Sequence, residues 1–174
     1  FEIKTPMTSY HEYNKVDKAA YLVEQLANGK NIALVTDAGT PAISDPGEEL
    51  VKQAYAAGIP VTSLPGACAC VTALTLSGLL TRRFAFEAFL PSDKKLRRKI
   101  LDSLCTETRT VIIYEAPHHL RATLQELFAA LGDRRLTICR ELTKIHESAM
   151  QFTLSEAIYY YEQNAPKGEY VLVI

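Results

Sequence analysis

The stretch from Thr36 to Gly47, TDAGTPAISDPG, has the residue types of a ligand-binding loop. It follows an apolar run and precedes a helical pattern that begins near Glu48, which is where loops at the carboxyl ends of parallel strands bind ligands. Gly39 permits a turn that a side chain would block, and Pro41 fixes the backbone. Because bulky side chains are almost absent, the backbone amides of this loop can approach a small ligand. A plain surface connection is the alternative interpretation.

A second loop of similar character, LPGACA, runs from Leu64 to Ala69. It also lies between an expected strand and an expected helix. Its small residues expose amides at a helix N-terminus, where the helix dipole favours anions such as a carboxylate. Two such loops on neighbouring strands would share one crevice. The alternative is a tight corner with a small-residue packing face.

Two later clusters of polar residues also follow expected strands. The first runs from Tyr114 to His119, and the second from Arg140 to Lys144 together with Glu147. The first is either a pocket edge or the surface of a helix start, and the second is either a site wall or a surface loop with weak ion pairs. A metal site is not expected at His118 and His119, because adjacent helical residues point apart.

The segment from 92 to 99 carries a local charge of +4 in a chain whose net charge is −1. Arg82 and Arg83 lie just before it. A concentrated basic patch of this kind suits a phosphate backbone, although no aromatic residue interleaves it for base stacking. A solvated helix face is the alternative.

Composition narrows the class of protein. The chain has 174 residues, of which 48% are hydrophobic, so a packed core is expected and disorder is not. No apolar run approaches the roughly 20 residues of a membrane span, and no signal peptide opens the chain. The four cysteines lack zinc-binding spacing. The chain begins at Phe1 and ends within an apolar run, so we expect a fragment of a longer protein.

The first part of the chain predicts a βαβα pattern. Gly29 closes the first helix, and we expect Asp45 to cap the next one with Pro46 at its first position. The elements expected here are a helix at 17–27, a strand at 31–36, a helix at 48–57, a strand at 59–64 and a helix at 67–76.

The pattern restarts after Thr81, which we expect to be the boundary between two α/β domains, at 1–81 and 82–174. Strand directions in the second domain are expected to be mixed, and Ser155 is expected to cap its last helix. Its expected strands are 84–90, 109–114, 136–140, 149–153 and 168–174, and its expected helices are 93–105, 117–131 and 155–163.

Six motifs in this order resemble the ribosomal RNA small subunit methyltransferase I family, part of the tetrapyrrole methylase superfamily. They are TDAGTPAISDPG, IPVTSLPGACA, RFAFEAFLP, RTVIIYEAPHHL, RELTKIHE and KGEYVLV. The resemblance covers nearly the whole chain. It implies a tetrapyrrole methylase-like fold of two α/β domains, with S-adenosylmethionine in a cleft between them. It also implies methyl transfer to the ribose 2′-hydroxyl of a cytidine in 16S rRNA.

Site residues follow from the same resemblance. Gly39-Thr40-Pro41 stands where relatives have Gly-Asp-Pro, and Cys68 and His119 depart from the usual Ser and Arg. The implied cofactor-binding residues are Asp37, Gly39, Thr40, Pro41, Ile43, Ser44, Pro65, Gly66, Ala67, Cys68 and Tyr114. The candidates for the general base are Glu87, Glu115, Glu141 and Lys144, and the expected RNA contacts are Arg82, Arg83, Lys94, Lys95, Arg97 and Arg98.

The family pattern has a further N-terminal segment with a first strand and a Pro-Ile-Gly-Asn-Leu loop. We therefore expect the first domain to be partial, and the chain as given to bind cofactor poorly or to be inactive. The implied partner is 16S rRNA or the small ribosomal subunit, in the cytoplasm, and a homodimer is compatible with the family. A tetrapyrrole methyltransferase and a non-catalytic ligand- or RNA-binding domain are the alternative functions.

Overall fold

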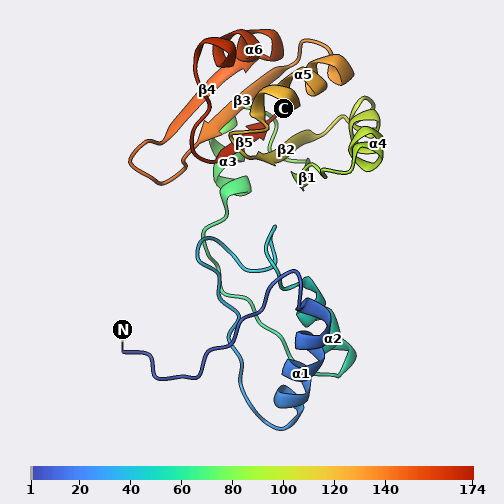
Figure 1. Cartoon of the computed structure of the whole chain (residues 1–174), viewed down its shortest axis with the longest axis vertical. Coiled ribbons are helices and arrows are strands. Elements are labelled where there is room, and N and C mark those ends of the chain that lie inside the picture. Colours follow the sequence, from blue (N-terminus) through green and yellow to red (C-terminus); the bar gives the residue numbers. More distant parts are fainter. Residues whose placement is uncertain (1) are drawn as a thin grey trace. The chain divides into compact units, whose positions relative to one another are not determined.

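A computed structural model of the chain describes residues 2–174. The chain divides into two compact units: the first ends at Cys68, and the second is Ala69–Ile174 (Figure 1).

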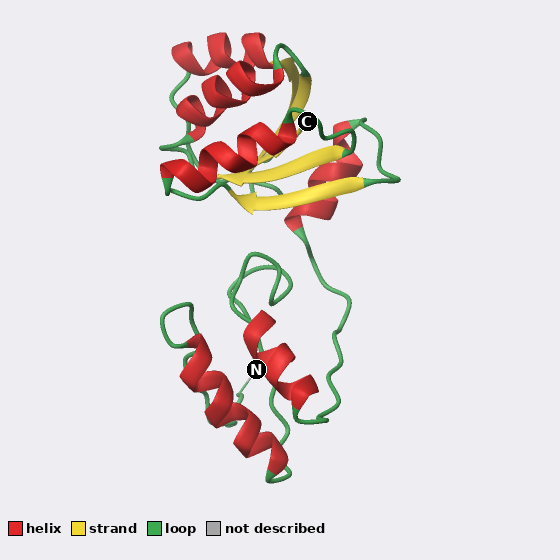
Figure 2. Cartoon of the chain, turned by 90° about the vertical axis from the view of Figure 1, so that its right-hand side faces the viewer, coloured by secondary structure: helices red, strands yellow, loops and turns green. Residues whose placement is uncertain are grey.

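The first unit is built on two helices that pack against each other. They are α1 (Lys15–Ala27) and α2 (Glu48–Ala56). Apolar residues at helical spacing bury Ala19 and Leu22 of α1 against Leu50 of α2. Figure 2 shows the rest of this unit as loop. Both helices were expected from the sequence at nearly these positions.

The two strands expected in the first unit are absent among its described residues. Residues 31–36 and 59–64 run as irregular chain without strand pairing, so that part of the prediction was wrong. Apolar character alone does not make a strand, since the N–H and C=O groups must pair with a neighbouring strand. Val35 and Leu64 are correspondingly 76% and 82% exposed.

The second unit is a five-stranded sheet with the order β1-β2-β5-β3-β4. β1 and β2 are parallel, and every other pairing is antiparallel, so the prediction of mixed strand directions is confirmed. The strands are β1 (Phe84–Phe89), β2 (Thr110–Glu115), β3 (Arg135–Arg140), β4 (Ser148–Thr153) and β5 (Tyr170–Val173).

Helices cover both faces of this sheet. The core on one face joins strand residues such as Ile113, Ile138 and Leu172 to the helices α4 (Lys94–Leu104), α5 (Leu120–Leu131) and α6 (Leu154–Gln163). Side chains alternate along a strand, so Val171 and Val173 face the opposite side. There α3 (Ala69–Ser77) contacts β3 and β5.

The packing of α3 also decides where the chain divides. Thr137 Oγ1 and Gln151 Nε2 donate to the carbonyl of Ser77 over 2.9 and 3.0 Å. These bonds tie the end of α3 to the sheet, so the structural division falls before α3, whereas the boundary expected from the sequence lies after it. The domain limits 1–81 and 82–174 stay a prediction.

The predictions that Asp45 caps α2 and that Ser155 caps α6 were wrong. Gly47 is the N-cap of α2, without a side-chain cap bond, and the helix begins after Pro46. At α6, Thr153 accepts from the backbone of Glu156, whose side chain returns to Thr153 in a capping box. Ser155 instead bonds to Asp133 over 2.8 Å. Thr153 lies directly before α6, so its hydroxyl reaches the unpaired amides of the first turn. Ser155 lies inside the helix, and its hydroxyl faces the loop that contains Asp133.

Candidate functional site

The first loop, 36–47, and residues 64–68 of the second loop lie together in the first unit. Thr40 Oγ1 donates to the carbonyl oxygen of Ala67 over 2.9 Å. A Cβ atom added to Gly66 would lie 3.3 Å from Thr40 Oγ1, and one added to Gly39 would lie 3.6 Å from the oxygen of Ala67. The expected meeting of the two loops is therefore observed, although neither loop follows a strand.

The first loop is held in an unusual backbone shape. Thr36 Oγ1 donates to the carbonyl of Gly39 over 3.0 Å, and Gly39 has φ 80°. Ala42 and Ser44 also have left-handed backbones, with φ 67° and 60°. Such conformations are uncommon outside glycine and cluster where a loop holds a ligand.

Most amides of this loop have no acceptor among residues 2–174. Within residues 37–45, Ile43 alone donates its amide to a described acceptor, the carbonyl of Thr40 at 3.4 Å. The side chains around these amides are small and mostly exposed. The loop can therefore present several N–H donors to a polar ligand.

The other expected cofactor residue, Tyr114, lies in the second unit. Its hydroxyl accepts the amide of Cys70 in the first turn of α3 over 3.0 Å. Its ring makes edge contacts with Phe86 and Phe89, with centroid distances of 4.9 and 5.6 Å. Tyr114 thus belongs to an aromatic cluster at the carboxyl ends of two parallel strands. The cofactor-binding role of all these residues stays a prediction.

Glu87 lies at a β-bulge. Phe86 pairs with Ile112 and Ala88 with Ile113, so Glu87 is the extra residue, and Ala88 has φ 52°. Bulges re-aim side chains and often occur beside active sites. The sequence does not reveal this bulge, because FAFEAF reads as a regular strand.

Glu115 is buried, with 5% of its surface exposed, and belongs to a polar network. Its carboxylate accepts the hydroxyl of Thr123 and the amide of Ala116. The Thr123 hydroxyl in turn accepts from Arg97 over 2.7 Å, and Arg97 pairs with Glu126 at 2.7 Å. Thr123 was missed at the sequence level, since a threonine inside a helix carries no signal of its own.

Arg97 does not fit its expected role as an RNA contact. Its side chain is only 16% exposed, and its guanidinium is occupied by Thr123 and Glu126. Helical periodicity explains this difference from the other basic residues: one position of a basic helix faces its neighbour α5 while the others face solvent. A role of Arg97 in RNA contact stays a prediction.

Glu141 and Lys144 form a second charged cluster in the loop after β3. Lys144 Nζ lies 3.0 Å from Glu141 and 2.8 Å from Glu169. The Glu141 carboxylate also accepts a hydrogen bond from the amide of Glu169. This bond and the bond from Lys144 together lower the pKa of the Glu141 carboxyl. The two carboxylates raise the pKa of Lys144. A general base of the lysine type needs a lowered pKa, so this geometry favours a positioning role for Lys144.

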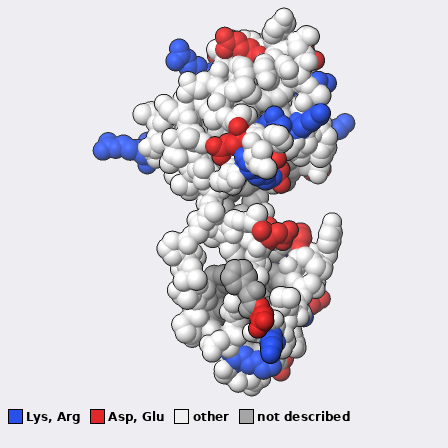
Figure 3. All heavy atoms as spheres, turned by 90° about the vertical axis from the view of Figure 1, so that its left-hand side faces the viewer, with Lys and Arg blue, Asp and Glu red and all other residues white. Residues whose placement is uncertain are grey.

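The remaining basic residues are exposed. Lys94, Lys95 and Arg98 lie on the outer surface of α4, where Arg98 pairs with Asp102 at 2.9 Å, and Arg82 and Arg83 precede β1. Figure 3 shows that on one face of the molecule basic and acidic side chains are interspersed. The exposed Lys94, Lys95 and Arg98 give α4 a local basic surface, and its contact with RNA stays a prediction.

Comparison with known proteins identifies the protein family. A family model described as Tetrapyrrole (Corrin/Porphyrin) Methylases matches residues 2–158. The chain belongs to the tetrapyrrole methylase family.

Within the part of the chain that is described, no group of three or more His, Cys, Asp or Glu side chains is placed to hold a metal ion, and no helix is long and apolar enough to cross a membrane.

Curated relatives place the chain more narrowly. It is 52% identical over 175 residues to the ribosomal RNA small subunit methyltransferase I of Synechocystis sp., covering 100% of this chain and 63% of that protein. It is 39% identical over 174 residues to the protein of that name from Thermotoga maritima, covering 100% of this chain and 78% of that protein. The chain spans 60–63% of the length of the first three curated relatives.

Solved structures agree on the fold. The methyltransferase CobJ superposes with a TM-score of 0.67 at 22% identity, covering 91% of this chain and 70% of that one. A uroporphyrin-III C-methyl transferase from Thermus thermophilus, complexed with S-adenosyl homocysteine, has a TM-score of 0.61 at 15% identity, covering 94% and 74%. The expected α/β, tetrapyrrole methylase-like fold is confirmed.

Replacing Thr40 by Val tests the contact between the two loops. Loss of one hydrogen bond of about 1 kcal/mol makes local opening roughly fivefold more frequent. We expect the amide of Ile43, which donates to the carbonyl of Thr40, to exchange faster by about that factor, with α5 unaffected. Thr40→Ser keeps the hydroxyl and should exchange like the wild type. Unchanged exchange in Thr40→Val would show that the contact does not hold the loops.

Replacing Thr123 by Val tests the buried network. The methyl group replaces a hydroxyl that serves both Glu115 and Arg97, so two charged groups lose a partner in the interior. We expect a decrease of ~1–3 kcal/mol in the free energy of unfolding, measured with urea. Thr108→Val, at an exposed position, is the matched control and should change stability by less than about 0.5 kcal/mol. Equal effects of the two substitutions would contradict a network role for Thr123.

Proposed function

We propose that this protein transfers a methyl group from S-adenosylmethionine to the ribose 2′-hydroxyl of a cytidine in 16S rRNA. The observation that carries the proposal is the pair of loops joined by Thr40 and Ala67, with backbone amides left available by the fold. The curated relatives named ribosomal RNA small subunit methyltransferase I support the choice of substrate.

The residues present fit the cofactor. The loop at 36–47 and the loop at 64–68 offer N–H groups and little side-chain bulk, as a ligand with a carboxylate and a nucleoside requires. A Cβ atom added at Gly39 or Gly66 would point toward the other loop, so glycine at these two positions keeps the space between the loops open. The cofactor supplies a methyl group already made electrophilic by a sulfonium, so the protein must mainly bind and align.

The chain's residues have separable tasks in this proposal. The two loops hold the cofactor, and the Tyr114 cluster offers an aromatic surface. A base must take the proton of a poorly acidic sugar hydroxyl. Glu115 is engaged by Thr123, and Lys144 is held protonated by two carboxylates, so both suit positioning better than proton transfer. Glu141 accepts from Lys144 and from the amide of Glu169, which lowers its pKa and makes it a weaker base, so Glu87 is the carboxylate that best suits proton transfer.

Methylation of a tetrapyrrole carbon is the second candidate function. The description of the matching family and the solved uroporphyrin-III enzymes favour it. The exposed lysines of α4 favour RNA, because their charges match phosphates. Parallel assays with small ribosomal subunits and with uroporphyrinogen III separate the two.

An rRNA substrate also implies a cellular setting. We place the protein in the cytoplasm with the small ribosomal subunit as its partner, and a homodimer is compatible with the proposal. Sedimentation of the protein with and without the small subunit tests both associations.

Replacing Gly39 by Ala tests the cofactor loop. The added methyl group strains a backbone at φ 80° and enters the space beside Ala67. We expect S-adenosylmethionine affinity, measured by calorimetric titration, to fall about tenfold or more. Gly29→Ala is the matched control: Gly29 has φ 85° with nothing within 4 Å of an added Cβ, so it imposes similar strain away from the loops. Equal affinity of both variants would contradict the assignment.

Replacing Lys94, Lys95 and Arg98 together by Ala tests the RNA surface. If each charge neutralises one phosphate, the slope of log affinity against log salt falls by roughly 2, at about 0.7 per phosphate of single strands. Binding of labelled rRNA fragments at several salt concentrations gives the slope. A variant that loses Lys18, Lys30 and Lys52 changes the net charge equally and should keep the wild-type slope. If the slope falls equally in both variants, or in neither, the result would contradict the proposal that α4 contacts the RNA backbone.

A further inference from the structure

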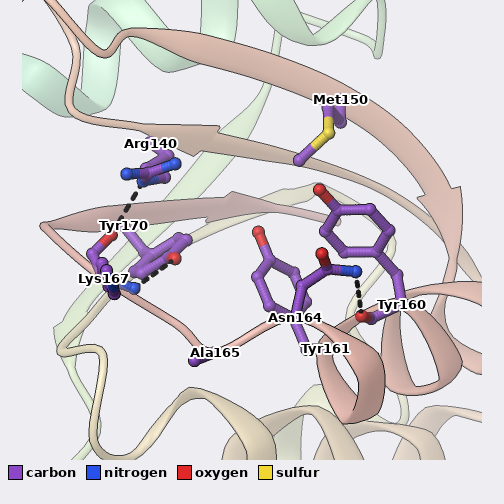
Figure 4. A pocket seen from close by; sticks show the side chains of 8 residues that line it. All are labelled: Arg140, Met150, Tyr160, Tyr161, Asn164, Ala165, Lys167 and Tyr170. Carbon is purple, nitrogen blue, oxygen red and sulfur yellow. Dashed lines mark hydrogen bonds between the residues drawn. The ribbon is translucent and has the colours of Figure 1, made fainter.

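A pocket that the proposed mechanism does not use lies on the α6 side of the sheet in the second unit. Its volume is about 240 Å³, smaller than the roughly 300–1,000 Å³ of most drug-sized ligand sites. It therefore suits one small ring system. The residues that line it are Arg140, Met150, Tyr160, Tyr161, Asn164, Ala165, Lys167 and Tyr170 (Figure 4).

Three tyrosine rings form one side of this tyrosine pocket. Tyr161 packs edge-on against Tyr160 and Tyr170, with ring centroids 5.0 and 5.8 Å apart. Figure 4 shows Arg140 and Met150, from neighbouring strands, on the other side of the space. The pocket thus combines aromatic surface, a thioether and a cation within one compact unit.

One polar atom in the pocket lacks a partner. Tyr161 is 97% buried, and its hydroxyl makes no hydrogen bond of ordinary length to any described residue, although the Tyr170 hydroxyl lies close enough to act on it electrostatically. Figure 4 shows this hydroxyl directed into the space that the lining residues enclose. Burial, with Tyr170 nearby, raises the pKa of Tyr161, so the group stays a neutral hydroxyl that can donate and accept. A buried hydroxyl without a partner is costly, which points to a ligand that satisfies it.

Arg140 is fixed on the side of the pocket opposite the Tyr161 ring. Its Nε donates to the carbonyl of Lys167 over 2.8 Å, and the amide of Lys167 donates to Tyr170 Oη over 3.0 Å. No ion pair of Arg140 occurs among residues 2–174, so its terminal nitrogens can serve an anion. Arg140 also pairs in register with Tyr170 across the sheet.

We propose that the tyrosine pocket receives one unstacked nucleotide of a single-stranded RNA segment. The base lies against the tyrosine rings, its edge bonds to the Tyr161 hydroxyl, and Arg140 contacts the phosphate. Proteins read single-stranded RNA in this manner, with aromatic stacking and bonds to base edges. The pocket adjoins the loop that begins at Glu141, a candidate site residue, so the nucleotide would be a neighbour of the target. This inference rests on the proposed RNA substrate.

Tyr161→Phe tests the inference, with fluorescein-labelled tetracytidylate as the probe and fluorescence anisotropy as the readout. Removing only the hydroxyl should weaken binding about three- to tenfold, the effect of one lost hydrogen bond. The melting temperature should stay the same or rise, because the hydroxyl has no hydrogen bond of ordinary length within residues 2–174. Tyr159→Phe is the matched control: Tyr159 lies on the same helix, is 69% exposed and does not line the pocket, so binding should stay within twofold.

A second variant guards against a folding effect. Ala165→Leu narrows the pocket from an exposed rim position and should weaken tetracytidylate binding without lowering the melting temperature. Wild-type affinity in both pocket variants, or equal weakening by Tyr159→Phe, would overturn the inference. Displacement of the probe by inorganic phosphate as readily as by cytidine monophosphate would reduce the pocket to a phosphate site and also overturn it.

The same measurements separate this inference from the proposed function. Probe binding requires neither cofactor nor methyl transfer. If Tyr161→Phe weakens binding while small subunits are not methylated, the pocket stands and the proposed reaction fails. If methylation proceeds with an unchanged KM for RNA in Tyr161→Phe, the reaction stands and the pocket fails.

Discussion

The insertion of β5 between β2 and β3 is the constraint on which the second unit depends. All four of its residues are buried, and both of its edges carry antiparallel hydrogen bonds. Its first residue, Tyr170, pairs with Glu115 on one side and Arg140 on the other. One strand therefore aligns the end of the Tyr114–Glu115 segment, the start of the charged loop after β3 and one side of the tyrosine pocket. A shift of β5 by one residue would turn its own side chains, including Tyr170, to the opposite face of the sheet and break these pairings.

The approach to β5 is equally restricted. Gly168 has φ 84°, and a Cβ atom there would lie 2.6 Å from the side chain of Glu141. Glu141 itself has φ 51°, and its carboxylate accepts a hydrogen bond from the amide of Glu169. Lys144 closes this arrangement by pairing with both carboxylates. Ion pairs that are only exposed would add little, but here they fix the loop after β3 against the segment before β5.

Patterns with local causes could be predicted from the sequence. Helical periodicity located the six helices found within residues 2–174, and alternation with turn residues located the five strands of the second unit. Expectations that depend on distant partners failed. Residues 31–36 and 59–64 are apolar enough for strands but do not pair, and Arg97 lies in a basic run but turns toward Thr123 and Glu126. The tyrosine pocket was also missed, because Arg140 and Tyr161 come together only through the sheet.

Our central proposal is that the protein to which this chain belongs uses the two small-residue loops in methyl transfer to ribosomal RNA. Its most direct test is incubation of the protein with small ribosomal subunits and S-adenosylmethionine labelled in its methyl group, followed by nuclease digestion and identification of the labelled nucleoside. The account predicts label in 2′-O-methylcytidine from 16S rRNA. Label in another nucleoside, or transfer to uroporphyrinogen III with none to the subunits, would contradict it.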